Sequence, residues 1–296
     1  DYLTSAISDD ELRMLFEVSG ERQVPIHVHV RRGYTGDIAG LIEVVNLAKE
    51  TKAPLFVVHI THNAMGRVSQ WLQMIDDAND AGANIATETL SYAAGGTSIS
   101  ADVFRNRDWQ GMFDITHEDV QWVATGEWLT EETWNKYARE QPGGAVNHHY
   151  VKEDWIETAL KWPRMMVATD ALPAVDLRVK TNPNVAGTFS RVLGHYVRDT
   201  GLLTLSDGLA RMSLYQAQWL SQSSSSFDKK GRIQLGADAD IVIFDPIKVQ
   251  ANAAYGDPYQ PPSGIPYVVV AGQIVVKNSV VVAGVYPGKR ILGDTK

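Results

Sequence analysis

The first part of the chain alternates between helix-like and strand-like patterns of apolar residues. Ser8 is a typical helix-capping residue, acids follow it, and Leu12, Leu15 and Phe16 share one face of the helix predicted over Ser8–Gln23. Short apolar runs rich in β-branched residues are typical of buried strands. Helical patterns also cover Asp37–Lys52 and Met65–Gly82, and strand-like runs cover Val24–Gly33, Ala53–His62 and Ala83–Tyr92.

This alternation predicts right-handed βαβ units and a parallel sheet. It breaks between about residues 93 and 149, a tryptophan-rich interval without a clean strand pattern. The interval predicts a lid-like insertion, although a helical insertion that only pads the fold fits equally well. The alternation resumes with a helix over Val151–Pro163, a strand over Arg164–Asp170 and a helical section at about 187–220.

The end of the chain has a different pattern. It is rich in Val and Ile with turn residues between the apolar runs, which predicts antiparallel strands of a small β domain. We therefore expect one domain over residues 1–225, which contains the insertion, and a second over residues 226–296.

Composition narrows the possible partners. The 296 residues are 44% hydrophobic and 21% charged, an ordinary globular composition. The formal net charge of −8 argues against nucleic acid or an anionic membrane as the main partner, and no apolar run approaches the roughly 20 residues of a membrane-spanning helix. There is no cysteine, which excludes disulfides, thiolate ligands and a cysteine nucleophile from this chain. We expect a cytoplasmic protein without nucleic-acid or membrane partners.

Three predicted strands end in residues that can bind a metal ion: His29, His59 and Asp170. The carboxyl ends of barrel strands are where catalytic residues gather, and imidazole and carboxylate suit zinc, manganese or iron. A bound cation would lower the pKa of a coordinated water to about 7 and so supply hydroxide for attack on a carbonyl. A nearby carboxylate could carry the proton to a leaving group.

Each of these residues also has a simpler interpretation. A single strand histidine is more often a hydrogen-bonded core residue, and Asp170 could cap the following turn; the combination on three strand ends favours a site. His27 lies deeper than His29 and is interpreted as a core residue or as support for a ligand. His62, just beyond His59, could contact substrate or lie in a surface loop. The adjacent His148 and His149 would face opposite ways on a strand.

Several segments resemble the amidohydrolase superfamily, and more closely its N-acyl-D-amino-acid deacylase (D-aminoacylase) branch. "GADADIVIFDP" (Gly236–Pro246) resembles the tail signature of the superfamily, and "PLFVVHITH" resembles the sixth-strand metal-histidine segment of its hydantoinase and aminoacylase branches. "VATDALP", "GTFSRVLGHYVRDTGLLTL" (Gly187–Leu205) and "GDPYQPPSGI" (Gly256–Ile265) resemble the D-aminoacylase branch itself. The resemblance implies a zinc-dependent hydrolase, with one or two Zn²⁺ ions on a TIM-like barrel, that cleaves the amide of an N-acylated D-amino acid.

By the same resemblance, His29 would be the fifth-strand ligand, His59 the sixth-strand ligand, and Asp170 the eighth-strand ligand and proton shuttle. The insertion would fall where that branch carries a lid. Substrate contacts are expected from His62, Tyr92 and Arg178.

Two departures from the branch concern the substrate. Its usual His-Pro-Arg motif, whose arginine suits a substrate carboxylate, is replaced by "NPN" (Asn182–Asn184). Arg178 or Lys180 would have to take the place of that arginine. Asn63 stands where the branch tends to have a lysine. Substrate choice is therefore expected to differ from a plain acyl-D-amino acid.

The superfamily also opens with an HxH pair on barrel strand one. If His27 and His29 were that pair, only four strands would be readable up to the Asp170 strand, whereas a closed barrel has eight. The fold expected is therefore α/β: strands 5–8 of a TIM-like (β/α)8 barrel, plus strands of a small β-sandwich. Together with Asp1 as first residue, this predicts a complementary N-terminal chain or fragment that supplies strands 1–4 and the HxH ligands.

Two other functions stay open at this point. One is hydrolysis of a cyclic amide, as in hydantoinases and dihydroorotases, which the segments Gly187–Leu205 and Gly256–Ile265 disfavour. The other is a non-catalytic, amidohydrolase-like partner subunit, which the altered "NPN" favours and the retained His29, His59 and Asp170 disfavour.

Overall fold

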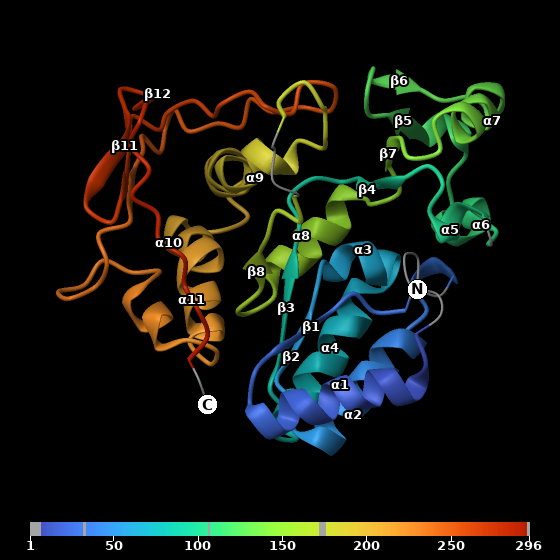
Figure 1. Cartoon of the computed structure of the whole chain (residues 1–296), viewed down its shortest axis with the longest axis horizontal. Helices are drawn as coiled ribbons and strands as arrows, with labels where there is room; N and C mark the ends of the chain where they lie inside the picture. Colours follow the sequence, from blue (N-terminus) through green and yellow to red (C-terminus); the bar gives the residue numbers. More distant parts are fainter. Residues whose placement is uncertain (1–6, 32–33, 106, 172–175, 295–296) are drawn as a thin grey trace.

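A four-stranded parallel sheet forms the centre of the molecule (Figure 1). The computed structural model describes residues 7–31, 34–105, 107–171 and 176–294. The sheet has the order β1-β2-β3-β8, and its strands are β1 (Ile26–Val28), β2 (Leu55–Val57), β3 (Ile85–Thr89) and β8 (Met166–Val167). Each lies within one of the four predicted strands, so the α/β class and the parallel pairing are confirmed. Two predicted segments are described only in part. Residues 32–33 of the strand predicted over Val24–Gly33 lie outside the described residues, as do residues 172–173 of the "VATDALP" segment.

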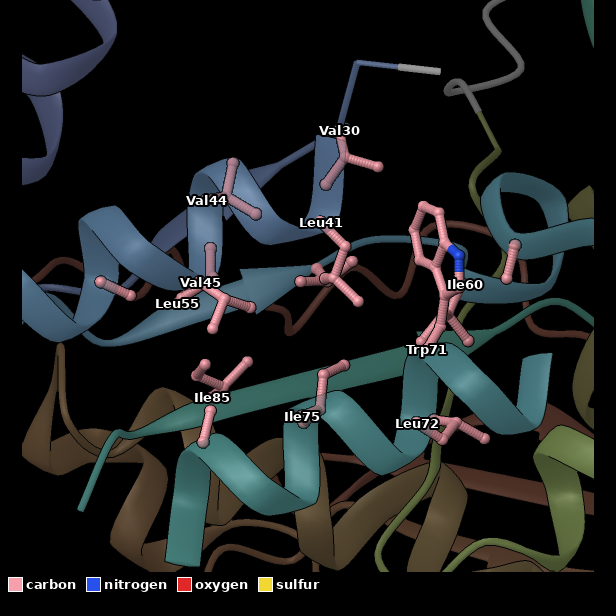
Figure 2. Close-up of a cluster of buried hydrophobic side chains, with 14 of the residues drawn as sticks. Val30, Leu41, Val44, Val45, Leu55, Ile60, Trp71, Leu72, Ile75 and Ile85 are labelled. Carbon is pink, nitrogen blue, oxygen red and sulfur yellow. The ribbon is translucent and has the colours of Figure 1, made fainter. Parts of the chain in front are cut away.

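Helices cover one face of this sheet and form the main core. They are α1 (Asp9–Arg22), α2 (Ala39–Thr51), α3 (Ile60–Ala64), α4 (Val68–Asp80) and α8 (Glu153–Lys161). Figure 2 shows Leu55 and Ile85 of the sheet among side chains of α2 and α4, including Leu41 and Trp71. Leu41, Leu55 and Trp71 are fully buried. Burying an aliphatic side chain stabilises the fold by roughly 1.5–3 kcal/mol, so this cluster fixes the helices against the sheet.

The predicted capping of the first helix is confirmed. The Ser8 hydroxyl accepts a hydrogen bond from the Glu11 backbone N–H at 3.1 Å, and Gln23 ends the helix in the left-handed conformation. Leu12 and Phe16 are buried against the core, whereas Leu15 is 44% exposed. The cap and the apolar stripe thus set where the chain enters β1.

The opposite face of the sheet carries a smaller aromatic cluster. Phe56 and Met166 pack with Trp219 of α11 (Tyr215–Leu220). The His27 ring stacks on Phe56, with centroids 4.6 Å apart and planes 20° apart. Side chains of one strand alternate between faces, so Leu55 and Val57 join the helix-covered core while Phe56 joins this cluster.

The insertion folds as a second, antiparallel sheet with the order β4-β7-β5-β6. Its elements are β4 (Gly95–Ser98), α5 (Asp102–Arg105), α6 (Trp109–Phe113), β5 (Val120–Trp122), β6 (Glu127–Trp128), α7 (Glu131–Glu140) and β7 (Ala145–His148). The expectation that this interval has no clean strand was wrong. These strands have two to four residues each, too few for an alternating pattern to stand out. Trp109 and Trp134 stack at 4.9 Å within its core.

Beyond β8, the described residues form three α-helices and a third sheet. The helices are α9 (Asn184–Arg191), α10 (Leu205–Leu209) and α11, with π-helical turns at Val192–Asp199 and Ala210–Leu214. Short 3₁₀ turns occur at Tyr34–Gly36, Met65–Arg67, His117–Asp119 and Ser225–Lys229. The third sheet has the order β12-β11-β10-β9, from β9 (Ile241–Ile243), β10 (Tyr267–Val270), β11 (Gln273–Lys277) and β12 (Val280–Val281). All its pairings are antiparallel, as predicted.

Two expectations about architecture stay predictions. In the described part of the chain, β1 and β8 are the edges of an open sheet, so the half-barrel interpretation is not established by these strands. The domain boundary at residue 225 is likewise untested. Among the described helices, none combines the length and the apolar character required to cross a bilayer.

Candidate active site

The two predicted histidine ligands meet at the carboxyl ends of neighbouring strands. His29 follows β1 directly, and His59 lies two residues beyond β2. Because β1 and β2 are parallel and paired, their ends lie side by side. His29 Nδ1 lies 3.0 Å from His59 Nε2, and the two rings meet edge to face. Asp170, beyond β8, lines the same cavity as both histidines.

Two of these three residues adopt the left-handed backbone conformation. The φ angle is 34° at His59 and 47° at Asp170. A residue other than glycine costs about 1–2 kcal/mol in this region, and such strain gathers at functional sites. At both strand ends, the backbone thus turns sharply at the residue whose side chain lines the cavity.

The cavity lies between these strand ends and the insertion. Its volume is about 60 Å³, room for one or two water molecules. The lining residues are His29, His59, His62, Leu90, Ala94, Gly95, Gly96, Thr97, Val103, His148, Tyr150, Asp170, Asn182 and Asn184. Among these described lining residues there is no lysine or arginine, so neutral polar groups and Asp170 set its electrostatics.

The insertion contributes His148, from the end of β7. A side chain at Gly95 would place its Cβ 2.6 Å from the His148 ring, so glycine is required for the ring to lie there. The His148 ring stacks on Tyr150, whose hydroxyl donates to the His62 carbonyl at 2.9 Å. His149 does not line the cavity, which agrees with the prediction that the two adjacent histidines face apart.

His59 is held from two sides. The Asn63 side-chain amide lies 3.2 Å from His59 Nδ1, and its nitrogen donates to the Val58 carbonyl at 2.9 Å. The His59 backbone N–H donates to Oε1 of Glu88, a buried carboxyl on β3. Partners of this kind fix the orientation of a ligating imidazole.

The two carboxyl groups at the site have raised pKa values. Burial raises the pKa of Glu88 to about 8; the His59 N–H opposes this rise, and the charge of Asp170 adds to it. Asp170 keeps much of its surface exposed, yet the protein around its carboxyl removes enough water to raise its pKa. A carboxyl with a raised pKa is suited to accept and return a proton near neutral pH.

The three predicted substrate contacts differ in position. His62, in α3, is buried and lines the cavity, with its ring edge to face with Tyr150. The Tyr92 hydroxyl donates to the Ala253 carbonyl at 3.0 Å, and Arg178 is exposed and forms an ion pair with Asp176 at 2.7 Å. Neither Tyr92 nor Arg178 is among the residues lining the cavity.

Sequence reasoning missed His148, Asn182 and Asn184, which line the cavity, and Glu88, which contacts the His59 backbone. Glu88 carried a usable signal, since a charged residue inside a predicted buried strand requires a partner. For His148, the sequence predicts only that it and His149 face opposite ways, and it does not tell which of the two faces the site. Asn182 and Asn184 differ in the sequence only as a departure from a family motif, which does not indicate a place in the cavity.

The donors present suit a metal ion in part. Two nitrogens bound to one tetrahedral zinc lie about 3.3 Å apart, given bonds of about 2.0–2.1 Å. The 3.0 Å between His29 Nδ1 and His59 Nε2 is close to that spacing. No group of three His, Cys, Asp or Glu side chains stands ready to hold a metal within the described ranges, so further donors would have to move or join.

Comparison with known proteins gives one family. The amidohydrolase family profile matches residues 3–276. A D-aminoacylase from Alcaligenes xylosoxydans xylosoxydans is 29% identical over 258 residues, which cover 82% of this chain and 50% of the relative. An N-acyl-D-glutamate deacylase from the same organism is 28% identical over 274 residues, covering 88% and 53%. The chain thus spans about half the length of these curated relatives.

A solved structure agrees with this comparison. The crystal structure of N-acyl-D-glutamate deacylase from Bordetella bronchiseptica, complexed with zinc and a phosphonate inhibitor, superposes with a TM-score of 0.77 at 28% identity. The match covers 91% of this chain and 56% of that one.

Proposed function

The chain belongs to the amidohydrolase family, and on that premise we propose that it serves in metal-dependent hydrolysis of the amide bond of an N-acyl amino acid, preferably of D configuration. The observation that carries the proposal is the approach of His29 and His59 at two strand ends, with Asp170 in the same cavity. The substrate class is that named for the D-aminoacylase and N-acyl-D-glutamate deacylase relatives.

We assign metal binding to His29, His59 and Asp170, and we propose Zn²⁺, one or two ions, as the cofactor. Imidazole nitrogens and a carboxylate are donors that zinc accepts. When bound, the cation supplies Lewis-acid polarisation of the amide carbonyl and lowers the pKa of a water molecule.

Asp170 is the proposed proton carrier. It takes a proton from the attacking water as the water oxygen bonds to the amide carbon. When the carbon–nitrogen bond breaks, Asp170 passes that proton to the departing amine nitrogen. Its raised pKa supports both steps, because the protonated and ionised forms then differ less in free energy at neutral pH.

For the substrate we propose contacts from His62, Tyr92 and Arg178. His62 lies at the cavity wall. Arg178 is the proposed partner of a substrate carboxylate: its side chain is 90% exposed, and a surface ion pair such as that with Asp176 is worth only about 0–1 kcal/mol. Tyr92 would first have to release the Ala253 carbonyl.

We also propose that the parallel sheet forms strands 5–8 of a (β/α)8 barrel, completed by a polypeptide that supplies the other strands and further ligands. The open edges at β1 and β8 of the described sheet support this, because unpaired strand edges in a parallel sheet are normally covered. Residues 226–296 are then the strands of the small β domain.

The test uses the protein purified under mild conditions from its native source. Intact mass spectrometry with metal analysis would identify any second polypeptide and zinc, and amine release would be measured from matched N-acyl-D- and N-acyl-L-amino acids. We expect zinc, D-selective hydrolysis and loss of both on chelation. Asp170→Asn should lower kcat by about 10²–10⁴-fold, whereas the surface change Asp154→Asn should not. A metal-free protein without hydrolysis would refute the proposal and would fit the non-catalytic alternative.

A further inference from the structure

Glu88 is a buried carboxyl in the middle of the parallel sheet. It lies on β3, between β2 and β8, and is paired in register with Met166. Only 4% of the residue is exposed. Glutamate is almost never buried this deeply without a partner, because its transfer from water is costly. Its place in the core therefore requires an explanation that packing alone does not give.

The contacts of Glu88 lead to one residue. Its Oε1 accepts the backbone N–H of His59, while Oε2 is buried without a hydrogen-bond partner among the described residues. The Thr87 side chain points to the other face of the sheet, where its hydroxyl donates to the Val57 carbonyl at 2.7 Å. Glu88 is thus the residue of β3 that reaches the His59 backbone.

His59 needs such a partner. Its φ and ψ angles of 34° and 59° are left-handed, and it precedes α3, whose first turn has no side-chain cap. The direction in which the His59 side chain leaves the backbone depends on these angles. An acceptor on the His59 N–H therefore stabilises the conformation that places Nε2 3.0 Å from His29 Nδ1.

We propose that Glu88 is a positioning residue, whose carboxyl holds the left-handed backbone of His59 so that the imidazole is aimed at the metal position. The inference rests on the proposed metal site. Glu88 acts on the His59 backbone, whereas Asn63 acts on the ring. It needs only an acceptor oxygen for this role, and a neutral amide supplies one.

The first measurement is independent of metal. The ¹H chemical shift of the His59 amide reports the hydrogen bond, so it should stay downfield in Glu88→Gln and move upfield in Glu88→Leu. Thr87→Val is the matched control, because it removes a hydrogen bond from the same strand without touching His59. An unchanged shift in Glu88→Leu would overturn the proposal, as would an upfield shift in Glu88→Gln equal to that of Glu88→Leu.

The second measurement follows the consequence for the metal. Zinc affinity by competition with a chromophoric chelator should fall about 10–100-fold in Glu88→Leu and change little in Glu88→Gln and Thr87→Val. The Co²⁺ absorption spectrum, which reports ligand geometry, should change only in Glu88→Leu. Wild-type affinity and spectrum in Glu88→Leu would overturn the positioning role. If His59→Ala binds zinc as well as the wild type, the metal site itself is refuted, and the amide shift alone decides whether Glu88 holds His59.

Discussion

His149 should make the stability of this protein fall as the pH is lowered below 6.5. It lies just after β7, with its ring against Trp128 at 4.8 Å and Tyr255 at 4.6 Å, and its Nε2 is buried without a hydrogen-bond partner among the described residues. Burial therefore lowers its pKa from 6.5 to about 4, although the charge of Asp119 opposes this. Through these ring contacts, His149 packs between Trp128 of the insertion and Tyr255.

The direction of this pH dependence follows from proton uptake by His149 on unfolding. Between pH 6.5 and about 4 the unfolded chain binds a proton at His149 and the folded chain does not, so stability is lost as the pH falls through this window. One pKa unit corresponds to about 1.4 kcal/mol. Over the full window, the free energy of unfolding therefore falls by about 3 kcal/mol, and between pH 7.5 and 5.0 it falls by about 2 kcal/mol.

The assay is urea unfolding of the wild type and of His149→Phe at pH 7.5 and 5.0. The phenylalanine keeps an aromatic ring and cannot titrate. On acidification, the free energy of unfolding of the variant should therefore fall by about 2 kcal/mol less than that of the wild type. Trp128→Phe is the control: it alters the packing but keeps the imidazole, and should retain the pH dependence. Equal losses in His149→Phe and the wild type would refute the reasoning.

Two further predictions concern packing. Leu41→Ala, at a fully buried site, should lower the free energy of unfolding by about 2–5 kcal/mol, whereas Leu235→Ala, at a fully exposed one, should change it by less than about 0.5 kcal/mol. Chemical denaturation measures both, and similar effects would contradict the core described above. Gly187→Ala would place a Cβ 2.0 Å from the Tyr92 hydroxyl and should cost about 1–3 kcal/mol by overpacking. Gly187→Ala combined with Tyr92→Phe should recover part of that loss; no recovery would show that the strain lies elsewhere.

The sequence by itself determined the local elements and their order. The Ser8 cap and the helical spacing of Leu12, Leu15 and Phe16 predict α1, and β-branched runs predict the four parallel strands, because these signals depend on neighbours along the chain. The same logic placed His29, His59 and Asp170 at one edge of the sheet, since the carboxyl ends of parallel strands meet there. The family resemblance carried by motifs such as "GADADIVIFDP" agrees with the family match.

The tertiary structure decided what these residues can do. The left-handed backbone of His59 and Asp170, the partner of Glu88 and the choice of His148 over His149 depend on contacts between segments far apart in the sequence. The four strands of the insertion are too short to show a period and form only by pairing with one another. Tyr92 is predicted as a substrate contact, but its hydroxyl donates to the Ala253 carbonyl, 161 positions away. Local patterns fix which face of an element is apolar, whereas the partner of each buried polar group is fixed only when the segments pack together.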